Sequence, residues 1–472
     1  DFLRDMAASA VVRAAASAAS AASQPARSRH QWRRKSFAFV GPKFSVLAMG
    51  LVAAIALASY MGGDHEQQAP AHRQLGYAYE PGVCESYITD YSKYISMVLL
   101  MWGIFYMFWG LAIICDDYFV SSLEAICEQL KLSDDVAGAT FMAAGSSAPE
   151  LFTSVMAVFA VKNDVGIGTI VGSAVFNLCI IIGGTALFTP GTLTIDWKPI
   201  TRDTLFYGIS IVAMILVLKD GVVVLVEACT LILCYGMYVV FMYFNPAIMT
   251  KMDECCGKKG EAVESEDAKE EEEEDDEPSP FSKAVTQPLT TLFEFTIPNL
   301  ASYADKKDAS PPFLTAFFMS IIWIGVLSYW MVTWASKLGC IWNIHPAVMG
   351  VTILAAGTSV PDAIGSLIVA KQGKGDMAVS NAIGSNVFDI LLGLGLPWLL
   401  NGLVYRDSPG IAVDAENIVP LSFILVGTLV AVYAVALISG FKLTPFVGLI
   451  FFSFYFIFVA YNLLHEFKFI DF

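Results

Sequence analysis

Long apolar segments recur along the whole chain and limit its fold more than any other feature. About 20 apolar residues suffice for a helix to cross the hydrocarbon core of a bilayer. Because 56% of the residues are hydrophobic and only 15% are charged, no water-soluble interior could hold them, which excludes a soluble enzyme. The chain is therefore predicted to be an all-α, polytopic membrane protein whose partner is the lipid bilayer. Eleven segments predict membrane-spanning helices, near residues 44–63, 94–115, 136–160, 166–189, 201–219, 222–243, 313–334, 346–370, 377–401, 416–438 and 443–463.

The first apolar segment differs from the others. A basic cluster at residues 33–35 precedes it and small residues end it, which is typical of a signal peptide or signal anchor. Its removal would leave about ten spans. Between Asp253 and Glu277 the chain has 14 Asp or Glu and 3 Lys; the run Glu270–Glu277 predicts disorder, because its charges repel one another and it has no apolar surface to bury. The predicted regions are a basic tail (1–43), the signal-like span (44–63), an extracellular segment (64–93), a first transmembrane half (94–250), an acidic cytoplasmic loop (251–300) and a second transmembrane half (301–472).

The distribution of basic residues predicts the orientation. If the basic cluster at 33–35 stays in the cytoplasm, segment 64–93 lies outside and the acidic loop lies in the cytosol. Cys84 and Cys340 then share the oxidising side of the membrane, and we predict a disulfide between them. Nothing in the charge pattern indicates nucleic-acid binding. The plasma membrane is favoured over an organellar one, and a homodimer is an assembly that the sequence allows.

An internal repeat is the most informative pattern. Residues 138–183 and 350–395 match at a constant offset of 212 without a gap, and the polar positions coincide as well as the apolar ones. Five predicted spans separate the starts of the two copies, and an odd number of crossings inverts the second copy relative to the first. Two inverted five-helix repeats are the plan of secondary transporters, whose broken helices meet at the bilayer midplane.

Each repeat carries an acidic residue directly after a proline. Pro149 and Pro361 should break their helices, because proline lacks a backbone donor and clashes with the carbonyl one turn back. The carbonyls near 143–147 and 355–359 thus become candidate cation ligands. Glu150 and Asp362 lie in the middle of their spans, where a carboxylate costs about 2.5–3.5 kcal/mol, so a bridging cation is expected to hold them together.

Hydroxyl and amide side chains complete the predicted site. The hydroxyl side chains that lie three and four residues before each acid are expected to share its helical face. In the second part of each repeat, Asp389 is a third carboxylate, whereas its counterpart Asn177 is neutral. Carboxylates, hydroxyls and carbonyls are hard oxygen ligands, which suit Ca²⁺ and Na⁺. Three carboxylates could balance one Ca²⁺ and one K⁺. The other candidate ligands are Ser146, Ser147, Thr358, Ser359, Ser173 and Ser385.

These motifs resemble those of a known family. GSSAPELF at 145–152 and GTSVPD at 357–362, followed by GSAVFN at 172–177 and GSNVFD at 384–389, are similar to the two alpha repeats of the sodium/calcium exchanger superfamily. The similarity is greatest to its potassium-dependent members. It implies that Glu150 and Asp362 bind Ca²⁺ and, alternately, Na⁺, and that the hydroxyls and Asn177 are further ligands. An aspartate at the position of Asp389 implies dependence on K⁺, and so does the short acidic loop.

The predicted function is therefore antiport of Na⁺ inward against Ca²⁺ and K⁺ outward by alternating access. No cofactor is expected, since the only ligands implied are the transported ions Ca²⁺, Na⁺ and K⁺, and no phosphate-binding motif is found. A proton-coupled or potassium-independent calcium exchanger remains an alternative, as does a cation channel or a receptor-like membrane protein. An intramembrane enzyme would need a nucleophile with a nearby base, which the sequence does not supply.

Overall fold

The computed structural model describes residues 90–130, 143–189, 192–255, 280–298, 313–371, 373, 375–405 and 410–467. Within these ranges the regular secondary structure is helical except for four two-residue strands. The predicted signal-like span 44–63, residues 64–89 of the predicted extracellular segment and the run Glu270–Glu277 lie outside the described residues, so the predictions made for them stay predictions. The last four residues of the predicted extracellular segment already belong to a helix that begins at Asp90.

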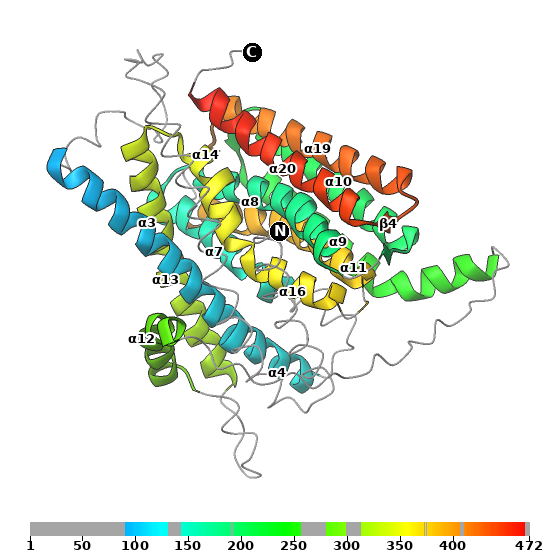
Figure 1. Cartoon of the computed structure of the whole chain (residues 1–472), viewed down its shortest axis with the longest axis horizontal. Helices are drawn as coiled ribbons and strands as arrows, with labels where there is room; N and C mark the ends of the chain where they lie inside the picture. Colours follow the sequence, from blue (N-terminus) through cyan, green and yellow to red (C-terminus); the bar gives the residue numbers. More distant parts are fainter. Residues whose placement is uncertain are drawn as a thin grey trace, which may run out of the picture.

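The predicted spans of the two halves correspond to helices, which pack into one bundle (Figure 1). Several of these helices are interrupted by short π-helical segments. The first half consists of α3 (Asp90–Ile113), η2 (Ile114–Phe119), α4 (Val120–Leu130), α6 (Ala143–Ser146), α7 (Ala148–Met156), η4 (Ala157–Val161), α8 (Val165–Phe176), η5 (Asn177–Ile181), α9 (Ile182–Phe188), β1 (Leu193–Thr194), α10 (Trp197–Leu218), β2 (Val222–Val223) and α11 (Leu225–Cys255). The second half consists of α12 (Pro280–Thr296), α13 (Phe313–Trp342), α14 (Pro346–Met349), η7 (Gly350–Leu354), α15 (Ala355–Thr358), α16 (Val360–Lys371), α17 (Gly375–Phe388), η8 (Asp389–Leu394), α18 (Gly395–Val404), β3 (Ile411–Ala412), α19 (Ala415–Ile438), β4 (Lys442–Leu443) and α20 (Pro445–Glu466).

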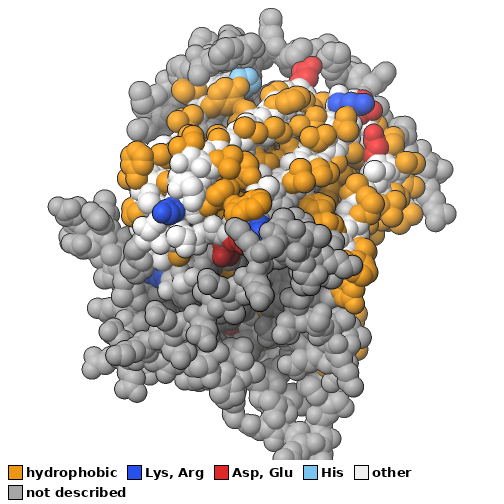
Figure 2. Space-filling model, turned by 90° about the vertical axis from the view of Figure 1, so that its right-hand side faces the viewer, with side chains coloured by type: hydrophobic (Ala, Val, Ile, Leu, Met, Phe, Trp, Pro, Cys, Tyr) orange, Lys and Arg blue, Asp and Glu red, His pale blue; other side chains and the backbone are white. Residues whose placement is uncertain are grey.

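The helices have the lengths that a membrane requires. In the described part of the chain, eight continuous helices are long and apolar enough to span a bilayer, and the bent pair Pro346–Thr358 and Val360–Lys371 makes a ninth span. The shorter apolar helix Ala148–Val161 occupies the remaining predicted span. Figure 2 shows the consequence on the surface: hydrophobic side chains dominate the described part of the face in view. The prediction of a polytopic helical membrane protein is confirmed.

Two small antiparallel ribbons establish that the halves are inverted. β1 pairs with β4, with Leu193 opposite Leu443, and β2 pairs with β3, with Val223 opposite Ile411. Since α10 runs from β1 to β2, the two ribbons lie at opposite ends of the bundle. β1 and β3 occupy equivalent places in the two halves, yet they belong to different ribbons. Equivalent connections thus lie at opposite ends, as the odd number of intervening spans predicts. We name the two ends of the bundle the β1–β4 end and the β2–β3 end.

The repeated helices form the centre of the bundle. In the span Val165–Phe188, 94% of the most apolar stretch is buried, against 17% in Leu225–Phe244, so the repeats lie inside and the others face outward. α8 crosses η7 closely, because a Cβ on Gly172 would lie 2.6 Å from the Cα of Val351. Small residues allow such close backbone approach between membrane helices.

The acidic region predicted at 251–300 contains a helix that the sequence analysis missed. In α12, Leu289 and Phe293 are buried one turn apart, and Phe293 packs edge-on against Tyr118 and Trp323 with ring centroids 6.1 and 5.4 Å apart. The helix forms because this apolar stripe packs on the bundle. The many carboxylates just before it dominate the composition of the region and hide the stripe.

Candidate cation site

The two proline breaks lie where the motifs predict them. α6 ends and α7 begins around Ser147, which has φ −88° and ψ 10°; its repeat partner Ser359 has φ −85° and ψ 3°. The second pair of helices bends by 41° at this point. Because proline has no N–H, Pro149 and Pro361 each leave the carbonyl four residues earlier without its helical donor. Each break thus exposes polar backbone inside the bundle.

The acid of each repeat accepts a hydrogen bond from a hydroxyl of the other repeat. Ser359 donates a hydrogen bond to Glu150 Oε1 at 3.3 Å, and Ser146 interacts in the same way with Asp362. The carboxylates of Glu150 and Asp362 also interact electrostatically, and both are buried. From the sequence, each hydroxyl is expected to share the helical face of the acid in its own repeat. The break changes the direction of the hydroxyls, so that they point across the pseudo-twofold axis instead.

The second part of each repeat contributes an amide on one side and a carboxylate on the other. Asn177 and Asp389 begin the π-helical segments η5 and η8, and such segments often occur at functional sites. Asn177 donates through Nδ2 to Ser385 Oγ at 3.3 Å and to Asn386 Oδ1 at 2.8 Å. Ser147 interacts with Asp389 at a geometry looser than a hydrogen bond.

Several buried oxygens of this site have no hydrogen-bond partner within the protein. They are Ser147 Oγ, Glu150 Oε2, Asn177 Oδ1 and both carboxylate oxygens of Asp389. Buried polar atoms in proteins are nearly always paired, so a cluster of unpaired oxygens indicates a ligand that accepts their lone pairs. Na⁺, Ca²⁺ and K⁺ bind oxygen ligands of this kind. In the described residues, no three His, Cys, Asp or Glu side chains converge on one metal position, so the three carboxylates are not arranged around a single cation in this structure.

The remaining predicted hydroxyls lie in the same buried region and donate to their own helices. Thr358 donates to Leu354 O at 3.1 Å, Ser173 to Ile170 O at 3.0 Å and Ser385 to Ala382 O at 3.3 Å. All three are buried. Because a hydroxyl that donates its proton keeps its lone pairs, these oxygens remain able to accept a cation.

Two polar residues near the site were missed from the sequence. Asp116 lies in η2, within a span that was predicted to end at residue 115, and its charge acts on Asp362. Asn386 is completely buried and bonds Asn177 and the carbonyl of Ala174. The signal for Asp116 was available: two consecutive aspartates interrupt an apolar run that continues on both sides of them. Asn386 lies inside the repeated motif, but its partner position is Ala174, so the repeat gave no indication of it.

Cys340 is disulfide-bonded. Among the cysteines whose side chains the structure describes, Cys115, Cys179, Cys229 and Cys234 are free. Cys84 lies outside the described residues, so its pairing with Cys340 stays a prediction.

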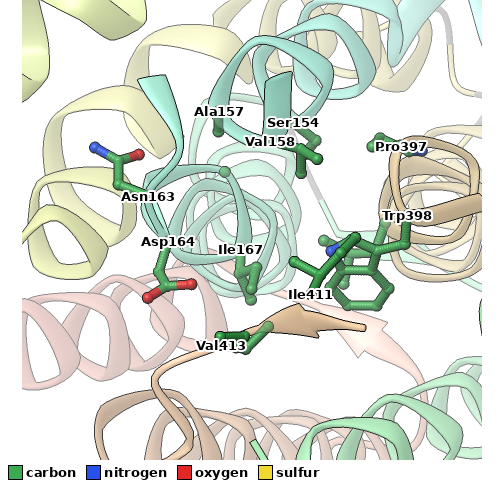
Figure 3. A pocket seen from close by; sticks show the side chains of 13 residues that line it. Ser154, Ala157, Val158, Asn163, Asp164, Ile167, Pro397, Trp398, Ile411 and Val413 are labelled. Atoms are coloured by element: carbon green, nitrogen blue, oxygen red, sulfur yellow. The ribbon is translucent and has the colours of Figure 1, made fainter. Parts of the chain in front are cut away.

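A pocket opens at the β2–β3 end of the bundle, close to the site (Figure 3). It measures about 390 Å³ including its open mouth. Asp164 and Asn163 lie on one side of it and Trp398 on the other. Ser154, which lines the pocket, is one helical turn from Glu150 on α7, so the pocket extends toward the buried carboxylates.

Charged side chains next to this pocket join four helices. His345 Nε2 lies 3.3 Å from Asp414 Oδ2, the backbone N–H of His345 donates to Glu466 at 2.6 Å, and the backbone N–H of Asp414 donates to Asp164 at 3.3 Å. The hydrogen bond from His345 holds the pKa of Asp414 down at about 2, whereas burial raises the pKa of Asp164 to about 6. Burial lowers the pKa of His345, but the hydrogen bond to Asp414 and the surrounding carboxylates outweigh burial and raise it above 6.5.

These pKa shifts predict a pH-dependent contribution to stability. Protonated His345 loses the N–H of Ala347 as a donor to Nδ1 but gains the attraction of Asp414, which is fully ionised at pH 5.5. Because the pKa of His345 is raised in the folded state, protonated His345 stabilises the fold fully below about pH 6.5. This stabilisation is lost as the pH rises through the folded-state pKa of His345. Asp414 contributes above about pH 4 and loses that contribution as pH falls toward 2. We expect His345→Asn, which keeps a helix-capping acceptor, to cost about 1 kcal/mol at pH 5.5 and clearly less at pH 8.5.

Thermal unfolding of the purified protein at both pH values measures this difference. An equal loss for His345→Asn at both pH values would contradict the prediction.

Comparison with known proteins identifies the family of the chain. The profile of the family described as sodium/calcium exchanger protein matches residues 100–244 and 313–464. The human sodium/potassium/calcium exchanger 5 is 34% identical over 400 residues, which cover 74% of this chain and 79% of that protein. The human sodium/potassium/calcium exchanger 2 is 32% identical, with 79% of this chain and 78% of that protein covered. A solved structure of the sodium-calcium exchanger NCX_Mj aligns with a TM-score of 0.44 and 22% identity, over 77% of this chain and 99% of that one. The chain belongs to the sodium/calcium exchanger family.

Proposed function

We propose that this protein is a secondary antiporter that exchanges Na⁺ for Ca²⁺ together with K⁺ by alternating access. The observation that carries the proposal is the reciprocal contact between the repeats, in which Ser359 bonds Glu150 and Ser146 bonds Asp362. It brings two carboxylates together in a buried, oxygen-lined site. The names of the related sodium/potassium/calcium exchangers agree with this choice of ions.

Charge balance explains the coupling. Glu150 and Asp362 together carry two negative charges, which one Ca²⁺ or two Na⁺ neutralise. Asp389 carries a third, which a monovalent ion neutralises. A buried site with unbalanced carboxylates is costly to close off from water. The closed state between the two access states is therefore favourable only when the site is fully loaded, and this couples the two fluxes.

The β2–β3 end is proposed to face the outside, with the acidic loop in the cytoplasm and the protein in the plasma membrane. Lys198, Arg202 and Lys442 lie toward the β1–β4 end, against Lys162 and Lys219 toward the β2–β3 end. This modest excess has the sign that the positive-inside rule predicts. The disulfide at Cys340 supports the same orientation, because α13 ends near His345 at the β2–β3 end and disulfides persist in oxidising compartments. The homodimer stays a prediction.

Asp389→Asn tests the assignment of K⁺. We expect Ca²⁺ uptake into Na⁺-loaded cells to rise several-fold with external K⁺ in the wild type. In the variant this stimulation should vanish, because an amide cannot balance the charge of a monovalent cation at a buried position. Asp220→Asn makes the same chemical change at an exposed turn and should leave the K⁺ stimulation intact.

The outcomes separate the alternatives. K⁺ stimulation that survives Asp389→Asn would refute the role of this residue but not Na⁺/Ca²⁺ exchange. Uptake driven by a pH gradient in the absence of Na⁺ would establish the proton-coupled alternative. Ca²⁺ flux without any counter-ion would establish a channel.

A further inference from the structure

The two halves of the bundle surround Asn177 and Asp389 with equivalent helices. η8, which begins with Asp389, packs against α10 and α11, and η5, which begins with Asn177, packs against α19 and α20. The aromatic contacts repeat as well: Tyr235 packs edge-on against Phe388 at 5.5 Å and 87°, and Tyr455 packs against Phe176 at 5.5 Å and 85°. Differences between the two surroundings are therefore informative about what each holds.

The register between α10 and α19 is well determined. Their N-caps are Asp196 and Asp414, and the strands β1 and β3 stand at the same spacing before them. The buried positions then coincide along both helices: Ile200 with Ile418, Ile211 with Leu429, and Met214 with Val432. In this register the equivalent of Tyr207 is Leu425, and both are completely buried.

The two polar residues therefore belong to one of the two equivalent surroundings. The helix packed against η8, which carries the Asp389 carboxylate, contributes the phenol of Tyr207, whereas the helix packed against η5, which carries the Asn177 amide, contributes the apolar Leu425. The hydroxyl of Tyr207 has no hydrogen-bond partner, and neither does either oxygen of Asp389. Besides Cys179, the electrostatic neighbour of the Tyr207 phenol is Asp389. An unpaired phenol in an apolar helix interior costs free energy, which a ligand for its oxygen would offset.

We propose that Tyr207 is a specificity-determining residue for K⁺, whose phenol oxygen binds the ion together with the Asp389 carboxylate. This proposal rests on the antiport function proposed above. K⁺ is larger than Na⁺ and Ca²⁺, and proteins bind it with several neutral oxygens in place of its hydration shell. Tyr207 adds an oxygen without adding charge, so one carboxylate and one positive charge remain balanced. The Oδ1 of Asn177 and the Oγ of Ser147, both unpaired, are further neutral oxygens in the same buried region.

Tyr207→Phe removes only the phenol oxygen and tests the proposal. Na⁺-driven Ca²⁺ uptake is measured in proteoliposomes over a range of K⁺ concentrations, at saturating Ca²⁺. We expect the half-saturating K⁺ concentration to rise about tenfold, the effect of losing one ligand contact of ordinary strength. The half-saturating Ca²⁺ concentration at saturating K⁺ should change by less than about twofold, because Tyr207 does not touch the Glu150–Asp362 pair. In Asp389→Asn, which needs no K⁺, adding Tyr207→Phe should have no further effect on K⁺ dependence.

Tyr455→Phe is the matched control. It also removes a buried, unpaired phenol oxygen, but on the side of Asn177, so its half-saturating K⁺ concentration should stay at the wild-type value. An unchanged K⁺ dependence in Tyr207→Phe, or an equal shift in Tyr455→Phe, would overturn the proposal. A wild type that transports Ca²⁺ equally well without K⁺ would instead refute the K⁺ part of the proposed function. Should Tyr207→Phe transport too slowly to measure, the rise in unfolding temperature with added KCl gives its K⁺ affinity directly, and a wild-type affinity there would equally overturn the proposal.

Discussion

Glu150→Gln is expected to abolish Na⁺-driven Ca²⁺ uptake, with a loss of more than about 100-fold. The side chain keeps its size, so the helix after Pro149 should be unaffected. The site loses one of the two negative charges that balance Ca²⁺, while Asp362 stays buried. Removing one member of a buried charged set costs about 3–5 kcal/mol, which corresponds to a factor of 100 or more in affinity.

Uptake normalised to the amount of protein at the cell surface measures this effect. Glu416→Gln makes the same change at an exposed position in the first turn of α19 and should transport like the wild type. Asp362→Asn should fail as completely as Glu150→Gln, because the two acids occupy equivalent places in the repeats. Uptake by Glu150→Gln within about threefold of the wild type would show that the repeats do not form the transport site.

Gly172→Ala is expected to have the largest effect on stability. The added Cβ would overlap the backbone of Val351, and backbone atoms cannot move aside as the end of a side chain can. Overpacking a tight contact costs about 1–3 kcal/mol, and we expect a value at the upper end because α8 and η7 are both buried at the crossing. Since Ser173 follows directly, the site should also be distorted, and uptake should fall together with the unfolding temperature.

Gly427→Ala is the control for this substitution. Gly427 lies in α19 with no atom within 4 Å of the position of its Cβ, so alanine there should leave the unfolding temperature unchanged or raise it. Equal unfolding temperatures for Gly172→Ala and the wild type would show that the close crossing of α8 and η7 is not required.

The repeat allowed much of the site to be predicted from the sequence. A constant offset of 212 placed Pro149 opposite Pro361 and Glu150 opposite Asp362. Both helix breaks lie there because the missing N–H of proline is a covalent property that no tertiary contact can change. The repeat also indicated the difference between Asn177 and Asp389. The sequence could not predict which hydroxyl donates a hydrogen bond to which acid. The pairing depends on the direction in which Ser146 and Ser359 point after each helix break.

Other features lay beyond the reach of sequence patterns. Tyr207 lies in an apolar helix outside the repeated motifs. Only the register of α10 with α19 shows that the equivalent position in the other half is apolar. Helix α12 was hidden by the acidic composition around it. In each case the deciding contact joins segments far apart in the chain.

The sequence by itself determined that the chain spans a membrane, that two oppositely oriented copies of one motif build it, and where their helices break. These properties follow from hydropathy, the parity of the crossings and the chemistry of proline, all of which are local. Only the tertiary structure decided that each acid is bonded by the opposite repeat, that no three acidic side chains in the described residues share one metal position, and that a buried phenol accompanies Asp389. These properties depend on packing between residues about 200 positions apart, such as Glu150 and Ser359, whose relative placement no local pattern encodes.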